Sequence, residues 1–241
     1  MSLPSFLPIP RAIRIKMNNE KRASFIGISR HRLATDGRGV TTLACFHGCP
    51  LRCKYCLNPH SFAPDTKVEK LTPLELYEKV RIDELYFLAT DGGVTFGGGE
   101  PLLYSEFIEE FRLLCGDRWH ICAETSLSVP REAVIRAAEC VDEFFVDCKD
   151  TNGEIYRSYT GKDNDVMLEN LRLLLSLVGS ERVTVRLPLI PGFNTESDRE
   201  KSRVLLEKTG VSRFDLFTYD TERGKRKISP QRVEKKTPDI K

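Results

Sequence analysis

The chain has 241 residues, of which 40% are hydrophobic and 30% charged, and its formal net charge is +2. This length suits one large α/β domain and is short for two. The nearly balanced charge argues against a nucleic-acid-binding protein, and the basic stretch from Glu222 onward lacks the aromatic residues that a nucleic-acid surface would carry. No stretch approaches 18 uninterrupted apolar residues, so we expect no membrane-spanning helix.

Short β-like runs alternate with helical stretches along the chain, which is typical of parallel βαβ units. We expect strands at 41–46, 93–96, 119–123, 142–147, 182–190 and 213–219. We expect helices at 73–88, 105–115, 130–140, 164–178 and 195–209. Six such units predict an α/β fold, a partial (β/α)6 TIM-like barrel. We divide the chain into an N-terminal arm (1–23), one domain (24–221) and a basic C-terminal tail (222–241).

The eight cysteines point to a reducing compartment. Three of them lie in one short loop and the others are single residues in apolar segments, which does not suit a disulfide framework. The first ten residues have no charged segment ahead of an apolar core, and prolines interrupt them. We therefore predict no signal peptide and a cytoplasmic location.

The most informative segment follows the first predicted strand, where Cys49, Cys53 and Cys56 lie within eight residues. In this C-x-x-x-C-x-x-C pattern three soft thiolates converge on one side of a turn and can hold three corners of a cubane iron–sulfur cluster. The fourth iron then has an open position for a substrate. Structural zinc sites are instead closed by four ligands, usually in two separated pairs, and no second C-x-x-C pair is present.

Two alternatives remain for these cysteines. Cys45 could complete a four-cysteine cluster of an electron carrier, but it lies in a predicted strand and we favour a packing role in the core. A thioredoxin-like role for Cys53 and Cys56 is weaker, because that motif has no third cysteine nearby. The other four cysteines are expected to pack as small apolar residues: Cys115, Cys122, Cys140 and Cys148.

Polar motifs occur where the predicted strands end. Gly97–Glu100 follows the second strand, Glu124–Ser126 the third and Asp147–Lys149 the fourth, Arg186 lies in the fifth, and Asp220 follows the sixth. In parallel βα barrels the reacting groups lie at the carboxyl ends of the strands, because the loops there meet at one mouth. We therefore expect these residues to form one site.

Each of these motifs also has a purely structural interpretation. The glycines could let the backbone approach a ligand, or could form a tight turn. Asp147 and Lys149 are two residues apart and so face the same side of a strand; they could bind a charged ligand or form a surface ion pair. Arg186 could contact a ligand or form an ion pair between strands.

Several motifs together resemble a known family. The C-x-x-x-C-x-aromatic-C loop, with Tyr55 as the aromatic residue, is similar to that of the radical S-adenosylmethionine (SAM) superfamily. The segments Thr35–Gly39, Val94–Pro101, Val146–Asp150 and Tyr159–Gly161 occur in the order typical of the glycyl-radical-enzyme activating enzymes, of the pyruvate formate-lyase activating type. The resemblance runs from about residue 24 to residue 219.

The resemblance implies an enzyme with one [4Fe–4S] cluster on Cys49, Cys53 and Cys56, with SAM bound to the open iron. Reductive cleavage of SAM would give a 5′-deoxyadenosyl radical that takes hydrogen from a glycine of a partner glycyl radical enzyme, with a flavodoxin or ferredoxin as electron donor. A monovalent cation near Glu124 and Asp147 is a further expectation. The implied cofactor contacts are Tyr55, Cys56, Leu57, Gly98, Gly99, Glu100, Glu124, Thr125, Asp147, Cys148, Lys149, Arg186 and Asp220.

Two departures from the family pattern bear on the substrate. Glu124 stands where the family has an aspartate, which changes the geometry for a cation, and Asp220 stands where the family has a histidine that borders SAM. The core also serves radical SAM enzymes that modify small molecules or ribosomal peptides, so such an activity is an alternative. A non-catalytic iron–sulfur electron carrier is a third possibility.

Overall fold

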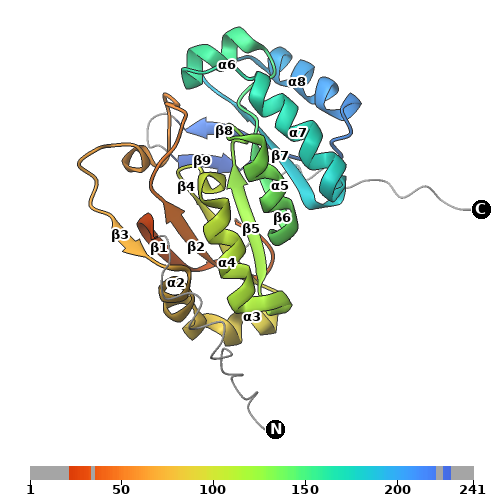
Figure 1. Ribbon diagram of the computed structural model, residues 1–241. Helices are drawn as coiled ribbons and strands as arrows, with labels where there is room; N and C mark the ends of the chain where they lie inside the picture. The colour runs from red at the N-terminus through yellow and green to blue at the C-terminus, as the bar shows by residue number, and fades with distance from the viewer. Residues whose placement is uncertain (1–21, 34–35, 221–224, 229–241) are drawn as a thin grey trace, which may run out of the picture.

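The fold is an open, nine-stranded sheet with helices along one side, as Figure 1 shows for the computed structural model of the chain. The structure describes residues 22–33, 36–220 and 225–228, with Asp220 and the last four residues described by their backbone alone. Within this part, the strand order is β3-β1-β2-β4-β5-β6-β7-β8-β9. The two edge strands β3 and β9 do not pair with each other, so the sheet forms a partial barrel.

Six neighbouring strands are parallel. They are β2 (Val40–Phe46), β4 (Gly93–Gly98), β5 (His120–Thr125), β6 (Glu143–Asp147), β7 (Val183–Leu189) and β8 (Arg213–Asp220). Their bounds differ from the predicted ones by at most two residues at either end. The predicted partial (β/α)6 barrel is therefore confirmed.

The helices that connect these strands cover the outer face of the sheet (Figure 1). They are α2 (Pro73–Val80), α3 (Glu84–Thr90), α4 (Ser105–Cys115), α5 (Arg131–Cys140), α6 (Gly153–Thr160), α7 (Asp165–Val178) and α8 (Glu196–Lys208). Helices α2, α4, α5 and α7 pack side by side in succession. The four single cysteines predicted to pack as apolar residues are all buried; Cys115, Cys140 and Cys148 belong to the hydrophobic core as expected, whereas Cys122 does not. No helix in the described ranges is long and apolar enough to cross a membrane.

The prediction of one continuous helix over residues 73–88 is wrong, because two helices, α2 and α3, occupy this segment. Thr72 caps α2 through a reciprocal capping box with Glu75, but the helix gives way to a 3-10 turn at Arg81–Asp83 before α3. This turn brings the fully buried Asp83 to the first two strands, where its carboxylate accepts hydrogen bonds from Arg30 on β1 and from Thr42 on β2. A buried charge needs a partner, so the contact of Asp83 with a distant strand interrupts the single helix that the spacing predicted.

Apart from short 3-10 turns, three strands and one helix of the described residues were not predicted. The antiparallel strands β1 (Ala23–Leu33) and β3 (Glu69–Leu71) extend one edge of the sheet, and β9 (Lys225–Ile228) pairs with β8 at the other edge. The helix is α6. Strand β1 begins at the end of the proposed arm 1–23, and β9 lies within the proposed tail 222–241; residues 1–21 and 229–241 lie outside the described part of the chain.

Side chains of the parallel strands alternate between the two faces of the sheet, as the period of two in a strand requires. On β5, Ile121 and Ala123 belong to the hydrophobic core beneath the helices. His120 and Glu124 instead line a cavity on the inner face. The inner wall of the partial barrel is consequently polar, and the cavity extends along it from one end of β5 to the other.

Candidate active site

The cysteine loop follows β2 and is anchored on two sides by backbone hydrogen bonds. Gly99 N–H donates to Phe46 O at 2.9 Å, and Glu100 N–H donates to Gly48 O at 2.8 Å. On the other side, Arg52 N–H donates to Thr160 O at 2.8 Å, at the end of α6. The unpredicted helix α6 therefore helps to fix the loop that carries the three thiols.

The glycines after β4 are explained in part by this packing. Gly98 has a φ of +88°, which glycine adopts most readily. A Cβ on Gly99 would lie 2.1 Å from Gly48 O, so only glycine lets the β4 turn approach the cysteine loop this closely. Of the two interpretations of these glycines, the structure shows the tight turn, and this turn also leaves their backbone able to approach a ligand.

We expect Gly99→Ala to displace the cysteine loop and to lower the iron content of the protein. The added methyl group would overlap the backbone of Gly48, which cannot move as a flexible side chain could, at a cost of about 1–3 kcal/mol in stability. Iron per chain after anaerobic reconstitution measures the effect. Gly27→Ala is the matched control, because nothing lies within 4 Å of the added Cβ there; equal iron in the two variants would contradict the role of Gly99.

The structure places most of the predicted site residues around one cavity of about 1830 Å³. Those that line it are Cys49, Cys53, Cys56, Leu57, Gly98, Gly99, Glu100, Glu124, Asp147, Lys149 and Arg186. Tyr55, Thr125 and Cys148 are not among the lining residues, and the side chain of Asp220 lies outside the described part of the chain. The motifs at the carboxyl ends of the strands therefore do converge, as the barrel prediction required.

The three loop cysteines are half-buried, and their thiols lie in a setting that suits a metal cluster better than free thiolates. Burial raises the pKa of Cys53 to about 11 and that of Cys49 to about 12, and it also raises the pKa of Cys56. Thiolates here need a compensating positive charge, which a cluster iron would supply. The donor set and its position beside the cavity thus fit the predicted cluster.

Cys45 does not pack in the hydrophobic core, and that prediction is wrong. It is half-buried on β2, opposite Gly97. Burial raises its pKa to about 11, and the negative charge of Glu124 acts in the same direction. The strand alternation turns Cys45 away from the core that holds its neighbours Ala44 and Phe46. Cys45 is not among the residues that line the cavity with the other three loop thiols.

An acidic pair and an arginine lie side by side on the inner wall. The guanidinium of Arg186 donates to Glu124 Oε1 at 2.6 Å, and its Nη1 lies 4.0 Å from Asp147 Oδ1. Burial lowers the pKa of Arg186, but the carboxylates of Glu124 and Asp147 outweigh this and raise it. The interstrand ion pair considered for Arg186 is present, and it holds both carboxylates at the cavity.

Lys149 is buried and charged. Its Nζ lies 3.0 Å from Asp147 Oδ2 and donates to Tyr219 Oη at 3.3 Å. Burial lowers the pKa of Lys149, but the negative charge of Asp147 and the nearby Tyr219 outweigh it, so the pKa is raised well above its ordinary value. The alternative of a surface ion pair is wrong, because Lys149 is only 6% exposed. A buried ammonium at a cavity suits the binding of an anionic ligand group.

The side chains of Glu100 and Thr125 form hydrogen bonds with other residues of the protein. Glu100 accepts hydrogen bonds from the backbone of Leu102 and Ser126 and from the hydroxyls of Thr125 and Ser126, at 2.6–3.1 Å. Burial raises the pKa of Glu100, and these hydrogen bonds act in the opposite direction. Thr125 also accepts from Leu127 N–H. Both residues thus tie the β4 and β5 ends together.

Aromatic rings beside the cysteine loop were not predicted as a group. Tyr55 makes edge-to-face contacts with Tyr159 and Phe193, at centroid distances of 6.1 and 5.7 Å. Tyr159 and Tyr219 belong to a small buried cluster that Cys53 also contacts. These residues come from distant parts of the sequence, so spacing alone gave no signal for them. Cys148, between Asp147 and Lys149, is fully buried in the core, so only its backbone is near the site.

A family model described as the radical SAM superfamily matches residues 43–203. The chain belongs to the radical SAM superfamily. Membership confirms the predicted cofactors, a [4Fe–4S] cluster and SAM, and it identifies the chain as a radical SAM enzyme. The residues fit these cofactors, with three thiols on one loop for the cluster and a buried lysine beside the carboxylate of Asp147 for a zwitterionic ligand.

Several curated relatives are named as activating enzymes. The (2S)-3-sulfopropanediol dehydratase activating enzyme of Klebsiella oxytoca is 28% identical over 75% of this chain and 75% of its own length. The 4-hydroxyphenylacetate decarboxylase activating enzyme of Clostridioides difficile is 29% identical over 76% of this chain and 78% of its own length. The resemblance to the glycyl-radical-enzyme activating family is thereby confirmed.

A solved structure of a protein bound to S-adenosylmethionine shares the fold. Streptococcus suis SuiB bound to S-adenosylmethionine is 14% identical with a TM-score of 0.56, covering 76% of this chain and 41% of SuiB. This chain therefore spans less than half of SuiB, and the likeness shows the fold alone.

Proposed function

We propose that this radical SAM enzyme activates a partner glycyl radical enzyme by taking a hydrogen atom from a backbone glycine. The observation that carries the proposal is a single wide cavity that joins the cysteine loop to the Asp147–Lys149 pair. Its volume of about 1830 Å³ exceeds the roughly 300–1,000 Å³ of common small-molecule pockets. Space therefore remains beside a bound SAM for a segment of a protein chain, in line with the relatives named as activating enzymes.

The chain's own residues would bind and orient the cofactors. Cys49, Cys53 and Cys56 would hold the cluster, and Lys149 with Asp147 would bind the charged end or the ribose of SAM. The glycine turn at 98–99 would offer backbone groups to the amino end. When bound, a reduced cluster would supply the electron for reductive cleavage of SAM, and the 5′-deoxyadenosyl group so released would accept the glycine hydrogen as 5′-deoxyadenosine.

The proposal also covers the electron donor, the cellular location and a bound cation. One electron enters per cleavage, and a flavodoxin or ferredoxin is the proposed donor. The eight cysteines are all free thiols in the structure, which supports a reducing compartment, and we place the protein in the cytoplasm. A monovalent cation near Glu124 and Asp147 is also proposed, supported by these two carboxylates at one cavity; it would share them with the guanidinium of Arg186.

The test combines the reconstituted protein, SAM and dithionite with the glycyl radical enzymes encoded in the same genome, under anaerobic conditions. We expect 5′-deoxyadenosine by chromatography and a glycyl radical doublet by electron paramagnetic resonance, in equal amounts. Cleavage of SAM with no glycyl radical in any candidate would contradict the proposed substrate, and would favour a small molecule or a ribosomal peptide. Cluster reduction without SAM cleavage would contradict the enzyme function itself.

A further inference from the structure

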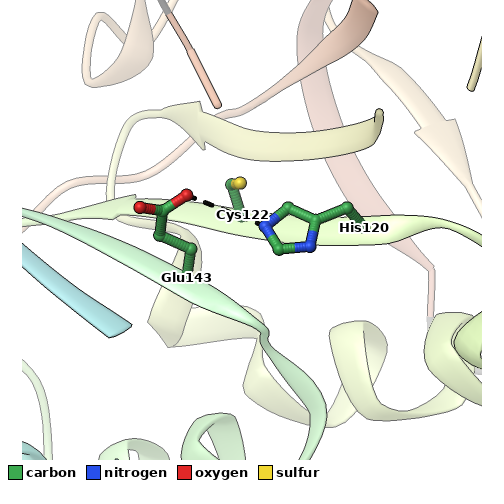
Figure 2. Close-up of side chains that lie close together, drawn as sticks. All are labelled: His120, Cys122 and Glu143. Atoms are coloured by element: carbon green, nitrogen blue, oxygen red, sulfur yellow. Dashed lines mark ion pairs between the residues drawn. The ribbon is translucent and has the colours of Figure 1, made fainter. Parts of the chain in front are cut away.

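A second group of potential metal ligands lies at the opposite end of β5 from Glu124. His120 and Cys122 are two residues apart on β5 and so face the same side of the sheet, and Cys122 pairs in register with Glu143 on β6. Figure 2 shows the three side chains converging. None of the three belongs to the cysteine loop or to the motifs assigned to SAM.

The spacing of the three side chains is close to that of a metal site. One ligand atom from each residue lies within 4.8 Å of those of the other two, and His120 Nε2 is 3.7 Å from Glu143 Oε2. In tetrahedral zinc sites the ligand atoms lie about 2.0–2.3 Å from the ion, which places them roughly 3.5 Å from one another. A small inward movement of the side chains would complete such a geometry.

The surroundings hold the Glu143 carboxylate in place and put a second carboxylate beside the imidazole of His120. Arg213 donates to Glu143 Oε1 at 2.6 Å, which leaves Oε2 directed at the imidazole. The other imidazole nitrogen, His120 Nδ1, lies 3.8 Å from Asp142 Oδ2. Histidine ligands in metal sites usually have a carboxylate or carbonyl beside the nitrogen that does not bind the metal. Asp142 is in the position for that role.

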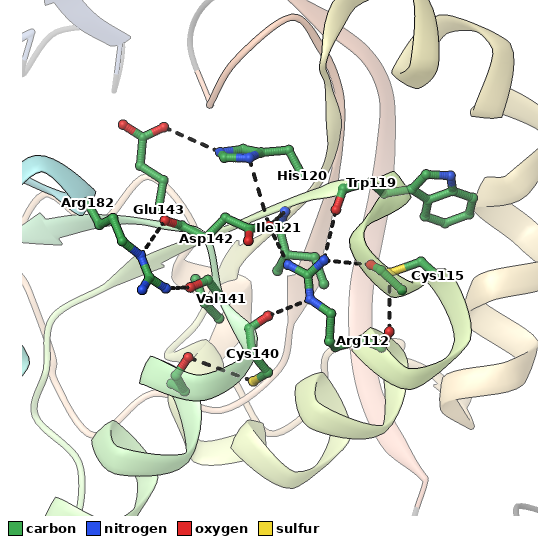
Figure 3. Close-up of polar contacts among 12 residues, drawn as sticks. Arg112, Cys115, Trp119, His120, Ile121, Cys140, Val141, Asp142, Glu143 and Arg182 are labelled. Carbon is green, nitrogen blue, oxygen red and sulfur yellow. Dashed lines mark hydrogen bonds and ion pairs between the residues drawn. The ribbon is translucent and has the colours of Figure 1, made fainter. Parts of the chain in front are cut away.

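Asp142 is itself fixed by a network that reaches the helices (Figure 3). Its carboxylate accepts hydrogen bonds from Arg112 and from Ile121 N–H, the latter at 2.7 Å. Arg112 also donates to the carbonyl of Cys140 at 2.9 Å and to that of Trp119 at 3.0 Å. The carboxylate beside His120 therefore has little freedom to move away.

The imidazole nitrogen of His120 that lies nearest to Glu143 has no hydrogen-bond partner. Nε2 is buried and has no hydrogen-bond partner, since the Glu143 oxygen at 3.7 Å is beyond hydrogen-bond distance. A buried polar atom without a partner is costly. A cation between the nitrogen, the carboxylate and the thiol would satisfy it.

We propose that His120, Cys122 and Glu143 bind a divalent transition-metal ion of the zinc class. The mixed nitrogen, sulfur and oxygen donors suit Zn²⁺ and disfavour Ca²⁺ or Mg²⁺, which prefer oxygen ligands. His120 and Glu143 also line the cavity, so a water molecule can take the fourth position. The site is independent of the proposed glycyl-radical activity.

The test measures zinc in the full chain after the iron–sulfur cluster has been reconstituted, so that iron occupies the loop thiols. The protein is incubated anaerobically with Zn²⁺, desalted and examined by metal analysis and zinc-edge X-ray absorption. We expect about one zinc per chain, with one sulfur ligand and the rest nitrogen or oxygen. Cys122→Ser should remove the sulfur signal, and His120→Ala should lose the zinc. Cys115→Ser, which changes a buried cysteine outside this group, is the matched control and should keep both.

Glu143→Gln keeps the shape of the side chain and an oxygen for Arg213, and it decides the question if His120→Ala does not fold. We expect it to weaken zinc affinity at least about tenfold. Unchanged zinc in Glu143→Gln and His120→Ala would overturn the proposal, as would the absence of zinc in the unmodified protein. Three sulfur ligands in the absorption spectrum would also overturn it, because they would place the zinc on the cysteine loop.

Discussion

Replacing Cys53 by alanine will abolish the iron–sulfur cluster. Cys49 and Cys56 would remain, and two thiolates cannot hold a cubane that needs three protein ligands for its open-iron form. Cys53 also packs against the small aromatic cluster around Tyr159, so the loop loses a contact as well as a ligand. Iron analysis after reconstitution should fall from about four per chain to near zero, and 5′-deoxyadenosine should not form.

Cys45→Ala is the matched control for this result. Cys45 lies four residues before Cys49 and carries the same chemical group, but it does not line the cavity with the other three thiols. We therefore expect the variant to retain its iron and to cleave SAM. If Cys45→Ala lost the cluster while Cys53→Ala kept it, the ligand assignment would be wrong and the four-cysteine alternative would have to be reconsidered.

Replacing Lys149 by methionine will weaken SAM binding without removing the cluster. Methionine keeps most of the length of the side chain but removes the buried charge beside Asp147. Hydrogen bonds to charged groups contribute about 1.5–3 kcal/mol, so the dissociation constant for SAM should rise roughly 10- to 100-fold. Equilibrium binding to the reconstituted protein measures it, with iron content checked in parallel.

Lys208→Met is the control for the charge change. Lys208 is exposed at the end of α8 and does not line the cavity, so its replacement alters the net charge by the same amount without removing a group from the site. Its SAM affinity should match that of the unmodified protein. Equal affinity in Lys149→Met would refute the proposed contact and would leave the Lys149–Asp147 pair with a structural role alone.

Two features of the site were predicted correctly from residue spacing: the orientation of Asp147 and Lys149, and the convergence of the strand ends. Asp147 and Lys149 were predicted to face the same way, and they form an ion pair at 3.0 Å, although β6 ends at Asp147 and Lys149 lies just beyond it. The convergence of the β4, β5 and β6 ends followed from the rule for parallel barrels. Neither result needed contacts between distant segments, because strand periodicity and βα alternation are local properties of the chain.

The sequence alone determined the parallel strands, the three clustered thiols and the positions of the main polar motifs. Tertiary structure decided the break between α2 and α3, because the buried Asp83 pairs with β1. It also decided the anchoring of the cysteine loop on α6. It brought His120 and Cys122 beside Glu143, through the pairing of β5 with β6. The physical reason is common to all of these: each depends on which distant segments become neighbours, and local propensity carries no information about that.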